Sequence, residues 1–127
     1  MQRYVRMVAE HAGDRSDPPD PQWKIVLDGI ETGDKLKPQV CFGYASEVDD
    51  DGISVTKWPF LLEPPKSNHS ARINFGPLAE PQYEAVNIFD REFRIDNFFT
   101  RGSGDDASTY RITKIEVLLQ AVMPQMR

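Results

Sequence analysis

The sequence predicts an all-β domain, mostly antiparallel, built as a sandwich or a barrel of about seven to nine strands with little helix. Apolar and polar residues alternate in several short segments, which is typical of strands with one face in a core and the other in water. Turn-forming pairs such as Asp–Gly separate these segments. The ten prolines fall mainly into clusters, and because proline lacks an amide donor, these clusters leave little room for a long helix.

The N-terminal half contains three predicted strands, residues 2–9, 22–28 and 39–46. In the second, Trp23, Ile25 and Leu27 share one face. In the third, the corresponding face is small: it consists of Cys41, Gly43 and Ala45. Such a face allows another element to pack closely, so this strand is predicted to be central. Residues 11–21 hold only Ala12 as an apolar side chain besides proline, which predicts a mobile loop.

The C-terminal half continues the alternation. Ile53 and Val55, and later Ile73 and Phe75, alternate with polar residues and predict short strands. Residues 83–89 and 92–99 predict a hairpin across Asp90–Arg91, although this pair lacks the Gly or Asn that a tight turn prefers. The last segment fits both a strand and a helical stripe. Its β-branched and aromatic residues favour a strand over 109–119, ending by Pro124 at the latest.

Composition limits the classes of function. A chain of 127 residues fits one domain spanning 1–127. The net charge of −5 would repel a phosphate backbone, so a nucleic-acid partner is not expected. A single cysteine, no signal-peptide core and no long apolar run together favour a cytoplasmic protein without a membrane segment.

No residue pattern predicts a catalytic residue, a metal or a cofactor. The chain has only two histidines, His11 and His69, which are too few for a typical zinc site. His69 lies among polar residues and is interpreted as an exposed loop histidine rather than a general base. Cys41, between Val40 and Phe42, is interpreted as a buried thiol rather than a nucleophile.

Two acidic turns leave a calcium site open as an alternative. They are Asp49–Asp50–Asp51 and Asp105–Asp106. Calcium prefers several carboxylate oxygens, but the spacing does not match an EF-hand loop, and adjacent aspartates cannot all point one way. Solvated hairpin turns are the favoured interpretation.

Four residues are predicted to form a binding surface: Trp58, Phe60, Phe98 and Arg101. The segment 57–65 concentrates large apolar side chains among prolines, where a regular strand is not expected to run far, so part of it should be exposed. Phe98 and Phe99 are consecutive, so on a strand one of them points away from the core. The alternative is that Trp58 and Phe60 are buried beneath a closing loop.

These features favour a non-enzymatic acidic β module that binds a protein, in an inhibitor, immunity or adaptor role, or that self-associates through an edge or an aromatic surface. The first alternative is a small-ligand-binding barrel whose interior cavity is lined by aromatic residues. A small hydrolase or isomerase that uses acidic residues with His69 is the least favoured hypothesis.

Overall fold

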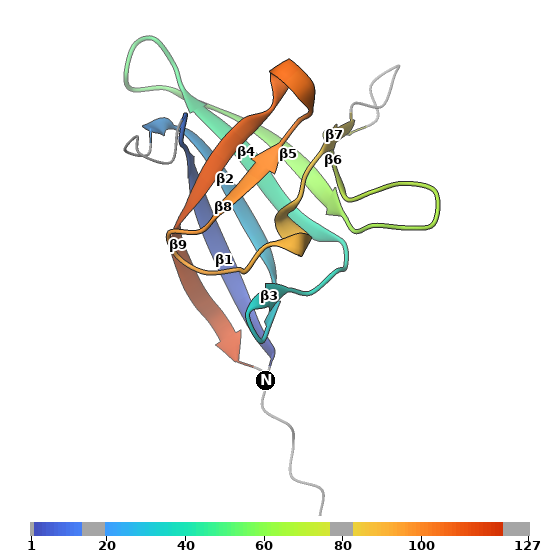
Figure 1. The fold of residues 1–127 in the computed structure, drawn as a ribbon. Coiled ribbons are helices and arrows are strands. Elements are labelled where there is room, and N and C mark those ends of the chain that lie inside the picture. Colours follow the sequence, from blue (N-terminus) through green and yellow to red (C-terminus); the bar gives the residue numbers. More distant parts are fainter. Residues whose placement is uncertain (1, 14–19, 77–82, 121–127) are drawn as a thin grey trace, which may run out of the picture.

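In the computed structural model, the described residues are 2–13, 20–76 and 83–120. They form one antiparallel sheet with no α-helix, which confirms the all-β prediction (Figure 1). Within these ranges the structure has no helix with the length and hydrophobicity that a membrane crossing requires. The strands are β1 (Gln2–His11), β2 (Asp20–Thr32), β3 (Lys35–Leu36), β4 (Cys41–Val48), β5 (Val55–Glu63), β6 (Arg72–Asn74), β7 (Tyr83–Ala85), β8 (Phe98–Arg101) and β9 (Ser108–Gln120), and the 3₁₀ turns are η1 (Ile88–Asp90) and η2 (Gly104–Asp106).

The sheet curls into a nearly closed barrel. Its strand order is β7-β6-β5-β4-β2-β1-β9-β8, with β3 paired only to β2, so most strands lie beside their neighbours in sequence. The outermost strands of this path, β7 and β8, meet through a bridge between Val86 and Arg101. Two backbone hydrogen bonds support the contact, from Asn87 to Thr100 at 3.2 Å and from Gly102 to Ala85 at 2.7 Å. Of the two architectures that the sequence allows, the barrel is the one observed.

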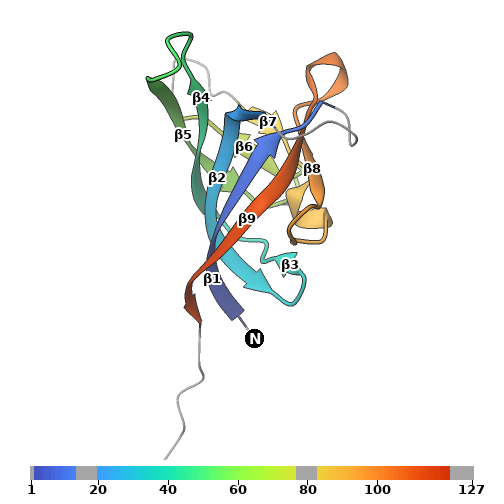
Figure 2. The same ribbon diagram turned by 90° about the vertical axis from the view of Figure 1, so that its left-hand side faces the viewer.

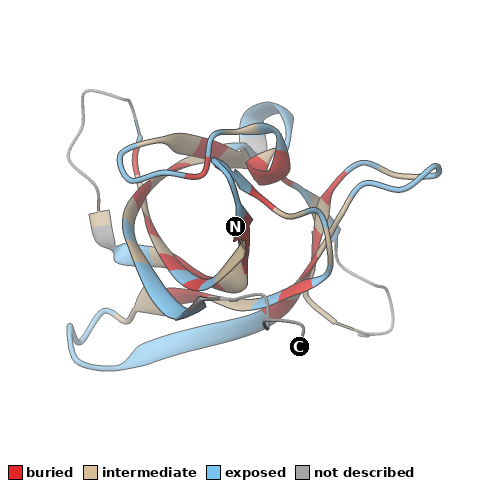
Figure 3. Cartoon of the chain, turned by 90° about the horizontal axis from the view of Figure 1, so that it is seen from below, coloured by how far each residue is buried: buried red, intermediate tan, exposed pale blue. Residues whose placement is uncertain are grey.

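Alternation along the strands places the core inside the barrel (Figure 3). Cross-strand pairs show this directly, because Met7 lies opposite both Leu27 and Ile115. Side chains fill the interior, and the void among them has a volume of only about 10 Å³. The buried residues that point inward include Val5, Met7, Ala9, Ile25, Leu27, Phe60, Leu62, Ile73, Phe99, Tyr110 and Ile112.

The small face of β4 is needed for this packing. A Cβ added to Gly43 would lie 2.9 Å from the ring of Phe60 and 2.5 Å from the carbonyl oxygen of Val26. Only glycine leaves room for the Phe60 ring, so the small face packs closely against another element, as the sequence predicts.

One end of the barrel is closed by apolar side chains. Leu36 of β3 is buried there with Phe89 of η1 and with Phe93. Hydrogen bonds join the two segments, from the Phe93 amide to the Asp34 carbonyl at 2.6 Å and from Lys35 Nζ to the Asp90 carbonyl at 3.4 Å. The connections β4–β5 and β8–β9 both lie at the opposite end, called here the mouth (Figure 1).

The prediction that a regular strand cannot run far through 57–65 is wrong. β5 extends to Glu63 and includes Pro59, although Ile53 precedes the strand and lies exposed in the turn. The reason is position: β5 pairs with β6 only over residues 61–63. Before that point one side of β5 has no described partner strand, so a missing amide there need not remove a ladder hydrogen bond.

The predicted hairpin across Asp90–Arg91 is also wrong. β7 ends at Ala85 and β8 begins at Phe98, and the residues between them contain η1 and the Phe93 plug. Of the apolar residues that suggested strands, Ile88 packs in the interior and Phe93 closes the barrel end.

The C-terminal segment is a strand, as predicted, and the helical interpretation is wrong over its described part. β9 pairs with β1 along most of its length, and this long-range pairing overrides the local helical stripe. Of the predicted loop 11–21, His11 belongs to β1 and residues 20–21 to β2, whereas 14–19 lie outside the described residues. Pro124 and residues 121–123 also lie outside them.

Candidate ligand site at the mouth of the barrel

Both tryptophans of the chain face the mouth. On β2, Leu27 and Ile25 point inward, and Trp23 is the next inward residue toward the mouth. On β5, Trp58 is likewise the inward residue next to Phe60 on the side of the mouth. The side chains border a cavity of about 430 Å³. This volume falls in the range of small-molecule sites. The cavity is lined by Trp23, Lys24, Ala45, Ser46, Glu47, Trp58, Pro59, Phe75, Glu84, Arg101 and Tyr110.

The cavity exists because β4 places a methyl group between the tryptophans. Ala45 lies directly opposite Trp58 of β5 and, on its other side, opposite Ile25 of β2. Two residues along β4, at its next inward position, Glu47 lies opposite Trp23. β2 and β5 are therefore separated by one strand, or about 10 Å at the usual spacing. One layer deeper Phe60 fills the space above Gly43, whereas Ala45 borders the cavity. The result is an aromatic-walled hollow with the Phe60 layer beneath it.

The far wall carries an ion pair. Arg101 of β8 donates from Nε to Oε2 of Glu84 on β7 at 2.7 Å, and from Nη2 to Oε1 at 3.4 Å. The same guanidinium lies 5.5 Å from the centre of the Phe75 ring and 5.9 Å from that of Tyr110. Two opposite charges thus neutralise one another within an aromatic setting, and the pair spans the contact between the outermost strands of the sheet.

Tyr110 lies at the base of this wall. Its ring stacks on Phe99 at 5.9 Å and meets His11 edge to face at 5.6 Å. Burial raises the pKa of the Tyr110 hydroxyl, a shift that the charge of Arg101 partly opposes. The phenol is therefore neutral at physiological pH.

The predicted binding residues lie in three different places. Trp58 and Arg101 line the mouth. Phe60 is 6% exposed and lies below the mouth, among the interior side chains. Phe98 points outward, with the guanidinium of Arg111 5.0 Å from its ring centre.

Sequence reasoning missed Trp23, Glu47, Glu84 and Tyr110 as site residues. Each lies on a predicted strand or beside one, so alternation alone assigned them to a core or a surface. The available signal was that Trp23 continues the inward face of Ile25 and Leu27 to the end of the strand, where a barrel must open. This signal points to a binding site only when the sheet is known to close into a barrel.

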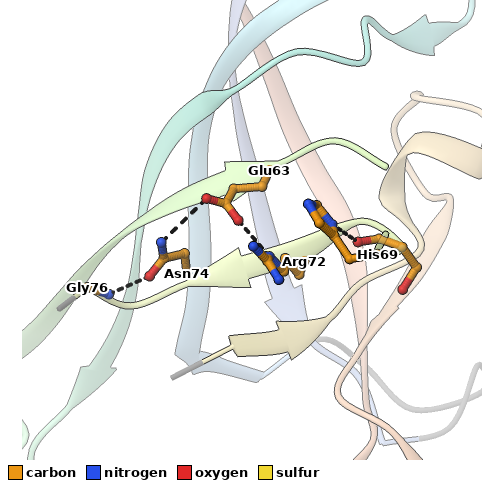
Figure 4. A network of polar contacts seen from close by, with 6 residues as sticks. Glu63, His69, Arg72, Asn74 and Gly76 are labelled. Atoms are coloured by element: carbon orange, nitrogen blue, oxygen red, sulfur yellow. Dashed lines mark hydrogen bonds and ion pairs between the residues drawn. The ribbon is translucent and has the colours of Figure 1, made fainter. Parts of the chain in front are cut away.

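The other candidate groups do not join the mouth. Cys41 is buried, and burial raises the pKa of its thiol to about 11. His69 lies in the β5–β6 connection with Nδ1 2.7 Å from the Ser70 carbonyl, beside the outer network of Glu63, Arg72 and Asn74 (Figure 4). The described residues contain no group of three or more His, Cys, Asp or Glu side chains placed to hold a metal ion.

The first acidic turn has a structural role. Both oxygens of Asp51 are engaged within the turn, Oδ1 by the amides of Ile53 and Ser54 and Oδ2 by the Ser54 hydroxyl. These bonds lower the pKa of Asp51. The carboxylate thus organises its own hairpin.

Comparison with protein-family models, with curated proteins and with solved structures found no match to this chain.

Proposed function

We propose that this protein binds a small organic molecule in the mouth of its barrel. The observation that carries the proposal is the exposure of the two tryptophans: Trp23 is 40% exposed and Trp58 is 41% exposed, and both border the same cavity. Covering the exposed part of each ring would contribute about 2 kcal/mol, since a buried aromatic side chain removes up to about 250 Å² from water. An aromatic ligand would recover this free energy.

This proposal develops the small-ligand alternative drawn from the sequence, with one change of place. The barrel interior is packed, so the ligand would occupy the mouth instead of the centre. Arg101, Glu84 and Tyr110 supply the few polar groups that orient ligands in such sites.

Tryptophan fluorescence tests the proposal directly, because both tryptophans lie at the site. We expect members of a library of small aromatic compounds to change the emission saturably, and mild purification followed by native mass spectrometry to retain a ligand.

Calorimetry of Trp58→Ala should show binding weakened at least about tenfold with a nearly unchanged melting temperature. Phe42→Ala, which removes an aromatic side chain from the outer face, is the matched control. Unfolding by Trp58→Ala would instead make Trp58 a core residue, and Trp23→Phe would then test the site.

A second candidate function, self-association, is supported by the free edge of β9. β8 pairs with β9 only over residues 108–111, and β9 runs on past the end of β8 (Figure 2). Residues 113–120 therefore have β1 on one side and no described strand on the other. Val117, Leu118 and Leu119 are all exposed there, and an apolar open edge is a template for a strand of a second copy.

Sedimentation velocity over a range of protein concentrations tests this second candidate. We expect a concentration-dependent dimer that Leu119→Lys disrupts, because a lysine on an edge strand opposes strand pairing. Ile53→Lys places the same charge on a still more exposed apolar position of the β4–β5 turn and should leave the dimer intact. A monomer at all concentrations would exclude the candidate.

A further inference from the structure

The charges at the mouth are not balanced on the side of the tryptophans. Glu84 is paired with Arg101, whereas Glu47 makes no hydrogen bond or ion pair with any described residue. Lys24 also lines the mouth, but it lies between the inward residues Trp23 and Ile25, so alternation directs its ammonium to the outer face. Glu47 is therefore a negative charge in the cavity wall that has no ion-pair partner among the described residues.

Glu47 faces Trp23 across two neighbouring strands. The two residues are directly opposite one another on β4 and β2, and side chains in such pairs start about 5 Å apart on the same face of the sheet. Asp49 follows directly after β4, and its Oδ1 accepts a hydrogen bond from the Thr56 hydroxyl at 2.9 Å; the carboxylate has no cationic partner among the described residues. The rim on this side thus combines an indole face with carboxylates.

We propose that the ligand of the mouth is a small organic cation that lies between Trp23 and Trp58 with Glu47 as its counter-charge. This inference rests on the proposed function and specifies the chemical class of its ligand. Tryptophan is the side chain whose ring attracts a cation most strongly, and a nearby carboxylate adds to that attraction. An anion would meet Glu47, and Arg101, the cation of the far wall, is already engaged by Glu84. The net charge of −5 also favours the approach of a cation.

Pairs of ligands that differ only in charge test the inference. Benzyltrimethylammonium and choline are the cationic probes, and neopentylbenzene and 3,3-dimethylbutan-1-ol are neutral molecules of the same shape. Titration followed by tryptophan fluorescence and calorimetry should show each cation binding at least about tenfold more tightly than its neutral partner.

Two carboxylate variants locate the charge that matters. Glu47→Gln should weaken cation binding about tenfold and leave the neutral compounds unaffected. Glu10→Gln is the matched control, because Glu10 lies between the inward residues Ala9 and His11 and so faces outward; its loss should change neither affinity. Circular dichroism and melting temperature show whether both variants are folded. If Glu47→Gln is unfolded, Glu47→Asp replaces it and should keep the preference for the cation.

The outcomes separate this inference from the proposed function. Equal binding of cation and neutral partner, or an unchanged affinity in folded Glu47→Gln, would overturn the cationic class while small-molecule binding stands. Failure of all four probes and of the wider library would overturn both.

An ammonium group can also be carried by a protein, as in trimethyllysine; the cavity of about 430 Å³ favours a free molecule. Tighter binding of a trimethyllysine peptide than of either free cation would assign the charge to a protein side chain.

Discussion

Cys41 illustrates how the position of one residue decides its chemistry. It lies on the inward face of β4, opposite Leu62, and its Sγ lies 3.3 Å from the Gln39 carbonyl oxygen. Burial disfavours the thiolate and raises the pKa of the thiol from 9.0 to about 11. The sequence allowed this residue to be recognised as a buried thiol because its neighbours alternate with it.

The folded protein should therefore react slowly with Ellman's reagent at pH 8. Raising the pKa of the thiol from 9.0 to about 11 reduces the fraction present as thiolate at pH 8 about 100-fold, and burial slows the reaction further. The measurement compares the rate of labelling in buffer with the rate in concentrated guanidinium chloride, with Cys41→Ala as the blank. Equal rates under the two conditions would contradict a buried Cys41.

Glu63 and Arg72 form an ion pair on the outer face of β5 and β6. Arg72 Nε donates to Glu63 Oε1 at 2.6 Å, and Asn74 Nδ2 lies 3.4 Å from Oε2 (Figure 4). The hydrogen bond from Arg72 lowers the pKa of Glu63 below its ordinary value of 4.5. Because the folded state favours the carboxylate, the stabilisation is present above the pKa of the unfolded chain and is lost as the pH falls through the folded pKa.

Glu63→Gln should therefore lower the free energy of unfolding at pH 7 by about 0.2–1 kcal/mol, the usual range for a solvent-screened ion pair. The difference from the unmodified protein should shrink below pH 4.5 and vanish once the pH is well below the folded-state pKa. Urea unfolding at several pH values measures it. A difference that persists undiminished at low pH would show that Glu63 stabilises the fold through contacts other than its charge.

At the scale of elements, alternation located the long strands well, because each has one face in the core. It failed at short elements whose apolar residues serve another purpose. Ile88 and Phe93 alternate with polar or outward residues as strand residues do, yet neither lies on a strand and both are buried in the core. β3 has only two residues and leaves no periodic pattern to detect. The error at Pro59 was the opposite one, because a strand was not expected where one exists. The effect of this proline depends on whether β5 has a neighbouring strand on both sides at that point.

Gly43→Ala should destabilise the barrel by about 1–3 kcal/mol through overpacking. The added methyl group would lie 2.5 Å from the Val26 carbonyl oxygen, and backbone of a central strand cannot shift freely. Ala45→Gly is the comparison on the same face: it causes no clash and should cost about 1–2 kcal/mol, from the loss of a buried methyl group and from a glycine within a strand. Chemical denaturation measures both. A neutral Gly43→Ala would show that the Phe60 ring is not held against β4.

At the scale of the whole molecule, the sequence could not predict how the sheet closes. Closure depends on contacts between segments far apart in the chain, such as β1 with β9, that no local pattern encodes. The candidate site follows from closure, because it brings Trp23, Trp58 and Arg101 from separate strands to one opening. Two of these three residues, Trp58 and Arg101, were predicted from their side-chain type, whereas their proximity was not.

The contact between β7 and β8 should be the first part of the barrel to open. Asn87 supports it twice: its amide donates to the Thr100 carbonyl at 3.2 Å, and its Oδ1 accepts from the Thr100 amide at 2.7 Å. The long ladders of β1 with β2 and β9 have many more hydrogen bonds to break. We therefore expect Asn87→Ala to speed hydrogen exchange in residues 85–87 and 99–102 while exchange in β1 stays unchanged, as followed by mass spectrometry. Glu84 and Arg101 span the same contact and line the mouth, so a bound ligand should slow hydrogen exchange at this contact more than in any other part of the barrel. If this contact exchanged as slowly as β1 in the free protein, the barrel would be sealed more firmly than two backbone hydrogen bonds, the Asn87 side-chain bond and the Glu84–Arg101 ion pair allow.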